Sequence, residues 1–319
     1  MRPCSLRALT CALATTLAAC EPQSSASIGM LATGKLEAPR LDEVSGIQAA
    51  QGTDGAFFVH NDDGEAIVHV IDAAGSDLGA VQITGAENRD WEDITTVPSA
   101  SGPLLVVADI GDNLARHETL TLYFVAEPLP GSDGRFGGES ALHHRIRLTY
   151  PDGPRDAESL AWDAAAGRLL IVTKRDKPPR IYGIPLASAL ASEAAELAFL
   201  GETVSFRRPA SRDLAVFGER DWPWISQPTG FDISPDGRHA AIISYRSVYL
   251  FERAEGESWP DALTRSPLEF EGPPSRKEEA IGYSADGAYL YVTSEGTHAP
   301  VYRVRQLLPG ADNAAQTTD

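Results

Sequence analysis

Short apolar runs alternate with polar turns along most of the chain. Five such runs occupy residues 56–59, 104–107, 169–172, 240–243 and 289–292. Each follows a turn signal rich in Gly, Asp, Ser or Pro, such as Ser234-Pro235-Asp236-Gly237, and each is followed by another strand-like segment. Short strands separated by such turns at a recurring interval predict an all-β repeat protein.

A second pattern marks the start of each repeat, where polar or acidic residues precede an aliphatic or aromatic one. These apolar positions are 47, 66, 71 and 50 residues apart, at Ile47, Ile94, Leu160, Phe231 and Ile281. The first and last intervals suit one four-stranded blade, whereas the middle two indicate insertions or a concealed blade. We therefore predict a β-propeller of four-stranded blades, with five counted and six compatible with the longer intervals.

The last repeat is too short to supply its own fourth strand. A strand around residues 34–37 is expected to close that blade, which would join the two ends of the chain. Helices are scarce, and residues 186–197 are the best helical candidate. The propeller is expected to span residues 31–308, with a disordered tail at 309–319.

The first nineteen residues have the features of an export signal. They carry Arg2 and Arg7, no acidic residue, and an apolar stretch too short to cross a bilayer. Leu17-Ala18-Ala19-Cys20 also resembles the bacterial lipobox, in which the cysteine becomes lipidated. We therefore expect a lipoprotein signal peptide at 1–19 and a lipidated Cys20 with a flexible stalk at 20–30. An ordinary signal peptide, cut nearby, is the alternative.

Cysteine usage agrees with a lipid anchor. The three cysteines are Cys4, Cys11 and Cys20, so the processed chain would keep only the lipidated one. That leaves no intramolecular disulfide, thiolate metal site or cysteine nucleophile. Two or more acyl chains hold a protein firmly on a membrane. Glu21, in place of the aspartate that retains such proteins in the inner membrane, favours the outer membrane.

The chain is acidic, with a formal net charge of −18. This charge argues against nucleic acid as a partner, because phosphates would repel it. It is compatible with cation binding or with solubility alone.

Blade geometry places the starts of the innermost strands on one face of the propeller, beside its axis. Those starts carry Glu92, Glu158 and Glu279 in three blades, and Ser45 and Thr229 in the other two. One hypothesis is an axial calcium site, because calcium takes about 6–8 oxygen ligands. The alternative is that each glutamate pairs with the arginine three residues earlier, or caps neighbouring backbone amides, and so holds the blades in register. These arginines are Arg89, Arg155 and Arg276.

The ends of the second strands should reach the same face. The candidates there are Asp62, Asp109, Asp112, Asn113, Lys174, Arg175, Arg246 and Glu295. Turn chemistry and solvated loop charges explain such residues equally well. His60 is the best acid–base candidate. The sequence contains no Gly-x-Ser-x-Gly elbow, phosphate-binding loop or dinucleotide fingerprint.

Several motifs together resemble a family. They are the 234–237 turn, Asp90-Trp91-Glu92-Asp93-Ile94, residues 108–113 and Glu279-Ala280-Ile281. The pattern is similar to uncharacterised secreted bacterial propeller lipoproteins, and to TolB-like and phytase-like propellers. The resemblance extends from about residue 40 to 306 and implies a fold, whereas propellers host many unrelated functions.

Two functional hypotheses follow from the resemblance and the polar face. The first is a binding or scaffold lipoprotein of the cell envelope, whose partner is an envelope protein or a small ligand. The alternative is a calcium-dependent, phosphoesterase-like hydrolase similar to phytases. That enzyme would need a metal on the axis with Lys174, Arg175 or Arg246 within reach of it.

Overall fold

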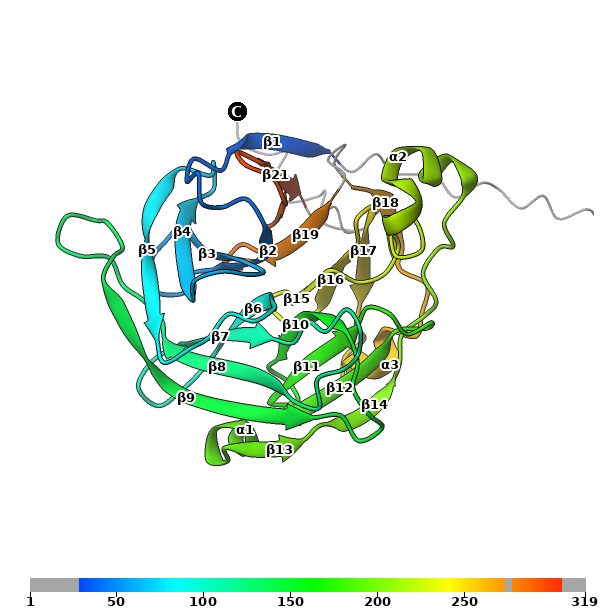
Figure 1. Cartoon of the computed structure of the whole chain (residues 1–319), viewed down its shortest axis with the longest axis horizontal. Coiled ribbons are helices and arrows are strands. Elements are labelled where there is room, and N and C mark those ends of the chain that lie inside the picture. Colours follow the sequence, from blue (N-terminus) through cyan, green and yellow to red (C-terminus); the bar gives the residue numbers. More distant parts are fainter. Residues whose placement is uncertain (1–28, 273–276, 306–319) are drawn as a thin grey trace, which may run out of the picture.

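The computed structural model describes residues 29–272 and 277–305 of the 319-residue chain. These residues form five four-stranded antiparallel blades around a central axis (Figure 1). The predicted β-propeller is confirmed, and no sixth blade is present within the described ranges. The leader, Cys20 and the predicted C-terminal tail lie outside the described residues.

The blades follow chain order. Blade 1 contains β2 (Val44–Ala49), β3 (Ala56–Asn61), β4 (Ile67–Asp72) and β5 (Asp77–Thr84). Blade 2 contains β6 (Trp91–Val97), β7 (Leu104–Asp109), β8 (Leu120–Ala126) and β9 (Glu139–Thr149). Blade 3 contains β10 (Ala157–Asp163), β11 (Arg168–Thr173), β12 (Arg180–Pro185) and β14 (Ala198–Glu202). Blade 4 contains β15 (Gly230–Ile233), β16 (His239–Ile243), β17 (Ser247–Glu252) and β18 (Leu268–Glu271). Blade 5 contains β19 (Glu278–Tyr283), β20 (Tyr289–Ser294), β21 (Pro300–Arg305) and β1 (Met30–Lys35).

The N-terminal strand closes blade 5, as the sequence predicts. β1 pairs antiparallel with β21, so Met30 lies opposite Val304 and Gly34 opposite Val301. The Thr33 hydroxyl donates to the carbonyl of Ala73 in the neighbouring blade at 2.7 Å. The two ends of the described chain therefore hold the ring closed together.

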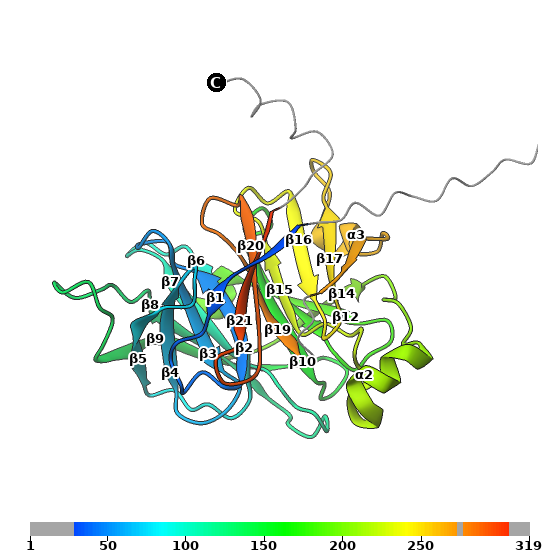
Figure 2. The same ribbon diagram turned by 90° about the horizontal axis from the view of Figure 1, so that it is seen from above.

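The interval between Leu160 and Phe231 contains insertions. α1 (Leu186–Ala191) and β13 (Ala194–Glu196) precede β14, and α2 (Ser211–Asp221) projects from the disc before β15 (Figure 2). α3 (Trp259–Ala262) joins the two outer strands of blade 4. No helix among the described residues is long and apolar enough to cross a membrane.

The predicted helix at 186–197 is only half correct. The chain becomes extended at Ser192, and β13 then pairs with the outer strand β9 in parallel. The outer edge of β9 has backbone groups that can pair with another strand. Residues 194–196 form these hydrogen bonds as β13, which they could not do as part of a longer helix. β5 also pairs with β9, which joins the outer edges of blades 1 and 2 into one continuous sheet.

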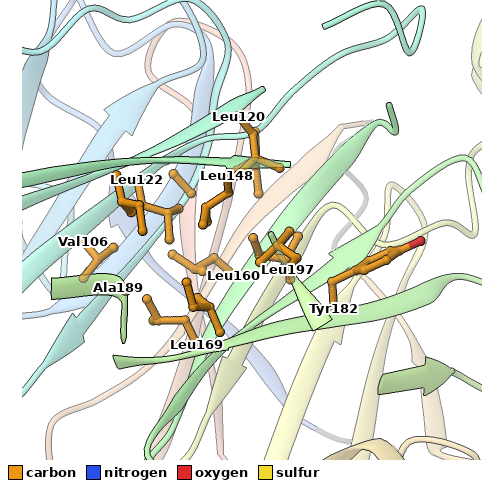
Figure 3. Packing of buried hydrophobic residues seen from close by; sticks show 14 of the residues in the cluster. Val106, Leu120, Leu122, Leu148, Leu160, Leu169, Tyr182, Ala189 and Leu197 are labelled. Carbon is orange, nitrogen blue, oxygen red and sulfur yellow. The ribbon is translucent and has the colours of Figure 1, made fainter. Parts of the chain in front are cut away.

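Apolar side chains fill the spaces between blades. Five buried clusters occur among the described residues, one at each boundary between neighbouring blades. Figure 3 shows the cluster between blades 2 and 3, where Leu122 and Leu148 meet Leu160 and Leu169. Burying such side chains is worth about 1.5–3 kcal/mol each, so these contacts stabilise the ring.

The innermost strands approach one another very closely. A Cβ atom on Gly282 of β19 would lie 2.5 Å from the Ile47 carbonyl oxygen of β2. Asp93 of β6 fastens two further inner strands, because its Oδ2 accepts the amide of Leu160 at 2.7 Å and that of Phe231 at 3.1 Å. These contacts hold β19 against β2, and β10 and β15 against β6.

Candidate axial site

The glutamates at the strand starts occupy β-bulges. The β6–β7 register passes from Trp91 opposite Asp109 to Asp93 opposite Ala108, which leaves Glu92 without a cross-strand partner. The register shifts in the same way at Ser45, Glu158 and Glu279. A bulge re-aims the side chain of the extra residue. The glutamate at the start of each of these repeats is therefore the bulge residue, which does not take part in regular strand pairing.

The three glutamates are buried together. Glu92 and Glu158 are 4% exposed and Glu279 is 5% exposed. Their charges influence one another, since Glu158 and Glu279 both raise the pKa of Glu92. The structure thus brings the predicted trio into one buried group beside the axis.

Lys174 lies within this group. It follows β11, is 3% exposed, and its ammonium donates to the Glu158 carboxylate and to the Tyr245 hydroxyl, the latter at 2.9 Å. Burial lowers the pKa of Lys174, but Glu158, Glu279 and Glu92 together raise it above its ordinary value. The side chain therefore stays cationic at neutral pH.

One ammonium does not balance three carboxylates. Burial raises the pKa of Glu92 well above its usual range, and the charge of Glu158 adds to that effect. Burial has the same effect on Glu279, despite Lys174, and it raises the pKa of Glu158 to about 7. The buried group consequently retains protons at neutral pH.

Asp156 adds a fourth carboxylate. Carboxylate oxygens of Glu92, Asp156 and Glu158 lie within 4.8 Å of one another. Such oxygens match the ligand chemistry of calcium. However, Asp156 already accepts the Asp112 amide at 2.9 Å and Arg175 Nε at 2.6 Å. A calcium ion would therefore compete with Arg175 and with Lys174 for these oxygens.

The two predicted hydroxyl ligands link strands. Ser45 Oγ donates to the Glu92 carbonyl at 2.9 Å and contacts a Glu92 carboxylate oxygen at 3.1 Å. Thr229 Oγ1 donates to the Glu278 carbonyl at 2.9 Å. Each hydroxyl joins the starts of neighbouring inner strands.

The expected pairing of each glutamate with the preceding arginine is wrong for the two described arginines. Arg89 pairs with Asp109 at 3.0 Å, and Arg155 pairs with Asp152 and Asp176. The bulges turn the glutamates inward, away from the ladder that the arginines would share with them. Arg276 lies outside the described residues.

The remaining polar-face candidates fall into separate contacts. Arg175 bonds Asn113 and lies over the Trp224 ring, with Cζ 4.6 Å from the centroid. Arg246 pairs with Asp213 of α2, and both side chains are buried. Asp112 closes its own loop by accepting the His117 amide at 2.6 Å. Glu295 pairs with Lys277.

Asp62 belongs to a second acidic group. Carboxylate oxygens of Asp62, Asp63 and Glu43 lie within 4.8 Å of one another. Burial and the charges of Glu43 and Asp63 raise the pKa of Asp62 to about 7. This group is partly exposed, unlike the axial one.

His60 does not reach the polar face. Its ring is fully buried between blades 1 and 2, edge-on to Trp91 at a centroid distance of 5.6 Å. Burial lowers the pKa of His60 to about 4, so the ring is neutral. A Cβ on Gly46 would lie 2.5 Å from Nε2, which shows how tightly the ring is packed.

Sequence reasoning missed Asp156 and the partnership of Lys174 with Tyr245. Asp156 precedes Glu158 by two residues, as Asp90 precedes Glu92. That shared spacing could have identified a second acidic position next to the start of each of these two strands, β6 and β10. Nothing in the sequence indicates the pairing of Lys174 with Tyr245, since the two come from different blades.

Comparisons with known proteins do not assign the chain to a family. No protein-family model and no curated protein sequence matches the chain. A solved luciferin-regenerating enzyme is similar, with a TM-score of 0.45 and 13% identity, over 88% of this chain and 96% of that chain. A chain of a mitotic checkpoint complex has a TM-score of 0.38 and 12% identity, over 82% of this chain and 62% of its own length. At such low similarity neither bears on activity.

Proposed function

We propose that this chain is an exported, lipid-anchored β-propeller that serves as a binding or scaffold protein of the cell envelope. Its lipid would attach at Cys20, with the outer membrane as the favoured location. The polar axial face would contact a protein or a small ligand. The leader sequence supports export, and the geometry of the axial face supports binding rather than catalysis.

The observation that carries this proposal is the position of Lys174. Its ammonium is held between Glu158 and Tyr245 in the middle of the buried carboxylates. A protein side chain thus already occupies the centre of the group. Around it, Arg175 is fixed by Asp156 and Asn113. The buried group thereby holds the accessible side chains above it, Arg175 and Asn113, in fixed positions, which suits recognition because little side-chain freedom is lost on binding.

The lipid anchor can be tested directly. Cells expressing the chain are fed a palmitate analogue, and the protein is followed through membrane fractionation. The wild-type chain should carry the label and sediment with the outer membrane. Cys20→Ser should be unlabelled and released. Label on Cys20→Ser, or wild-type protein confined to the cytoplasm, would refute the anchor.

The binding face can be tested by photo-crosslinking in intact cells. A photoreactive residue at Asn113, on the axial face, should give one discrete adduct. The same residue at His143, exposed on the outer strand β9, should not. Equal adducts at both positions, or none at Asn113, would count against recognition through this face.

A second candidate is a calcium-dependent, phosphoesterase-like hydrolase. The carboxylate oxygens of Glu92, Asp156 and Glu158 within 4.8 Å favour it, together with the guanidinium of Arg175 beside them. Calcium bound there would polarise a phosphate ester. In this reading Arg175 orients the phosphate, and the carboxylates hold the ion. Hydrolysis of p-nitrophenyl phosphate that needs calcium and is lost in Glu158→Gln would establish this candidate.

A further inference from the structure

The opposite end of the propeller axis contains a cavity of about 520 Å³. All five innermost strands contribute to its wall. The contributing residues include Gln48 of β2, Thr96 of β6, Trp162 of β10, Asp232 of β15 and Tyr283 of β19. The carboxylate group lies at the starts of the same strands, so Glu92 and Thr96 are roughly 13 Å apart along β6. The two sites are therefore at opposite mouths of the ring.

The cavity differs sharply in charge from the rest of this acidic protein. Asp232 is the only charged side chain among the described lining residues. Its two carboxylate oxygens accept the amides of Ile233 and Tyr283, each at 2.8 Å. Burial raises the pKa of Asp232 to about 7, so this carboxyl group is only partly ionised at neutral pH. The wall has no cation for a phosphate or carboxylate, so it favours an uncharged ligand.

Polar groups in the wall are left without partners. The hydroxyls of Thr96 and Tyr283 are buried and have no hydrogen-bond partner within the described residues. The amide of Gln48 makes one long contact, 3.4 Å to the Ala49 carbonyl. A buried polar group without a partner costs about 1–3 kcal/mol, so these groups favour a ligand that carries hydroxyls. A purely apolar ligand would leave them unpaired.

The rest of the wall is apolar and partly aromatic. Trp162 is half-buried, and Pro98, Pro103 and Pro235 also line the cavity. An indole face packs well against the C–H face of a sugar ring. The volume falls within the range of about 300–1,000 Å³ that is typical of small-molecule sites.

We propose that this cavity binds an uncharged carbohydrate of one or two sugar rings. One ring lies against Trp162, and its hydroxyls bond Gln48, Thr96 and Tyr283. The site is separate from the axial carboxylates. Its occupancy therefore does not depend on calcium or on the partner proposed for the polar face.

The test is saturation-transfer NMR and calorimetry on the purified chain with a defined set of sugars. The neutral probes are cellobiose, maltose and N,N′-diacetylchitobiose at millimolar concentration, and the charged probes are glucuronic acid and glucosamine. At least one neutral disaccharide should bind, and the charged sugars should not. Calcium and a chelator should leave binding unchanged.

Variants locate the binding. Trp162→Ala should abolish it, and Tyr283→Phe, which removes only the hydroxyl, should weaken it about fivefold. Trp224→Ala is the matched control, because it removes a half-buried indole beside the axial carboxylates. Should Trp162→Ala fold poorly, Thr96→Val provides a second, milder variant. Absence of binding by every neutral probe would overturn the proposal. Binding lost in Trp224→Ala but kept in Trp162→Ala, or binding only of charged sugars, would also overturn it.

Discussion

Lys174 and Glu158 form a buried ion pair beside the axis of the propeller. Glu158 occupies a bulge in the innermost strand of blade 3, and Lys174 follows the second strand of the same blade. The bulge turns the carboxylate toward the axis, where Glu92 and Glu279 approach from other blades. The pair therefore sets the charge at the centre of the candidate site.

Loss of the ammonium should destabilise the fold. Lys174→Met leaves the buried Glu158 carboxylate without its ammonium partner, and removing one partner of a buried pair costs about 3–5 kcal/mol. Urea unfolding at pH 7 should show a loss of this size. Lys177→Met is the control, because that lysine is exposed and its contact with the Trp224 ring is worth only about 0.5–1 kcal/mol. Equal stabilities of Lys174→Met and the wild type would contradict the pairing.

Glu92→Gln should change the pH dependence of stability. The pKa of Glu92 is raised in the folded chain, first by burial. A raised carboxyl pKa stabilises the fold below the unfolded pKa of about 4.3, and this contribution is lost as the pH rises through the folded pKa. The variant should match the wild type near pH 4 and be the more stable protein at pH 8.

Thermal melts across this pH range provide the measurement. Glu295→Gln serves as a control, because that residue is only half-buried and pairs with Lys277. If the wild type were the more stable protein at pH 8, ionisation of the buried Glu92 would not destabilise the fold, and the prediction would be wrong.

Asp93 should matter more for stability than any exposed acid. Asp93→Ala leaves the amides of Leu160, Phe231 and Ile94 without their acceptor. Each unpaired buried amide costs about 1–3 kcal/mol, so a loss of at least about 3 kcal/mol is expected in chemical unfolding. Asp54→Ala, at an exposed turn, should change stability little. A cost below about 1 kcal/mol for Asp93→Ala would mean that the inner strands do not depend on this carboxylate.

Closure of the ring can be tested at Gly34. A Cβ there would lie 2.0 Å from the carbonyl oxygen of Ala74, so Gly34→Val must displace β1. Overpacking of this kind costs about 1–3 kcal/mol. Gly29→Val is the matched control, because a Cβ at that position would have no neighbouring atom within 4 Å. Amide exchange should rise in β21 for Gly34→Val alone, and unchanged exchange would argue that β1 does not close blade 5.

The repeat pattern was enough to predict the architecture. Apolar runs such as 104–107 and turns such as 234–237 report directly on strands and their connections, because these depend on local sequence. The closing strand was predictable because blade 5 lacked one. The helix at 186–197 was overestimated, since the pairing of β13 with β9 is a long-range contact that local periodicity does not reveal.

The candidate site was only partly predictable. Glu92, Glu158 and Glu279 shared a position in the repeat, and the structure places them together. The sequence left calcium or the preceding arginines open as their cation and did not indicate the pairing of Glu158 with Lys174, because the bulges that turn the glutamates inward leave no mark in the sequence. The cavity at Trp162 and Tyr283 was missed altogether. Its residues come one from each blade and form no contiguous motif.

The most direct test is a thermal melt of the wild type and of Lys174→Met, each with excess calcium and then with chelator. If Lys174 supplies the cation of the axial site, calcium should not shift the wild-type melting temperature. Lys174→Met should then gain a calcium-dependent rise, because the carboxylates are freed for the ion. A rise of several degrees in the wild type, lost in Glu158→Gln, would contradict this assignment and favour the calcium-dependent hydrolase.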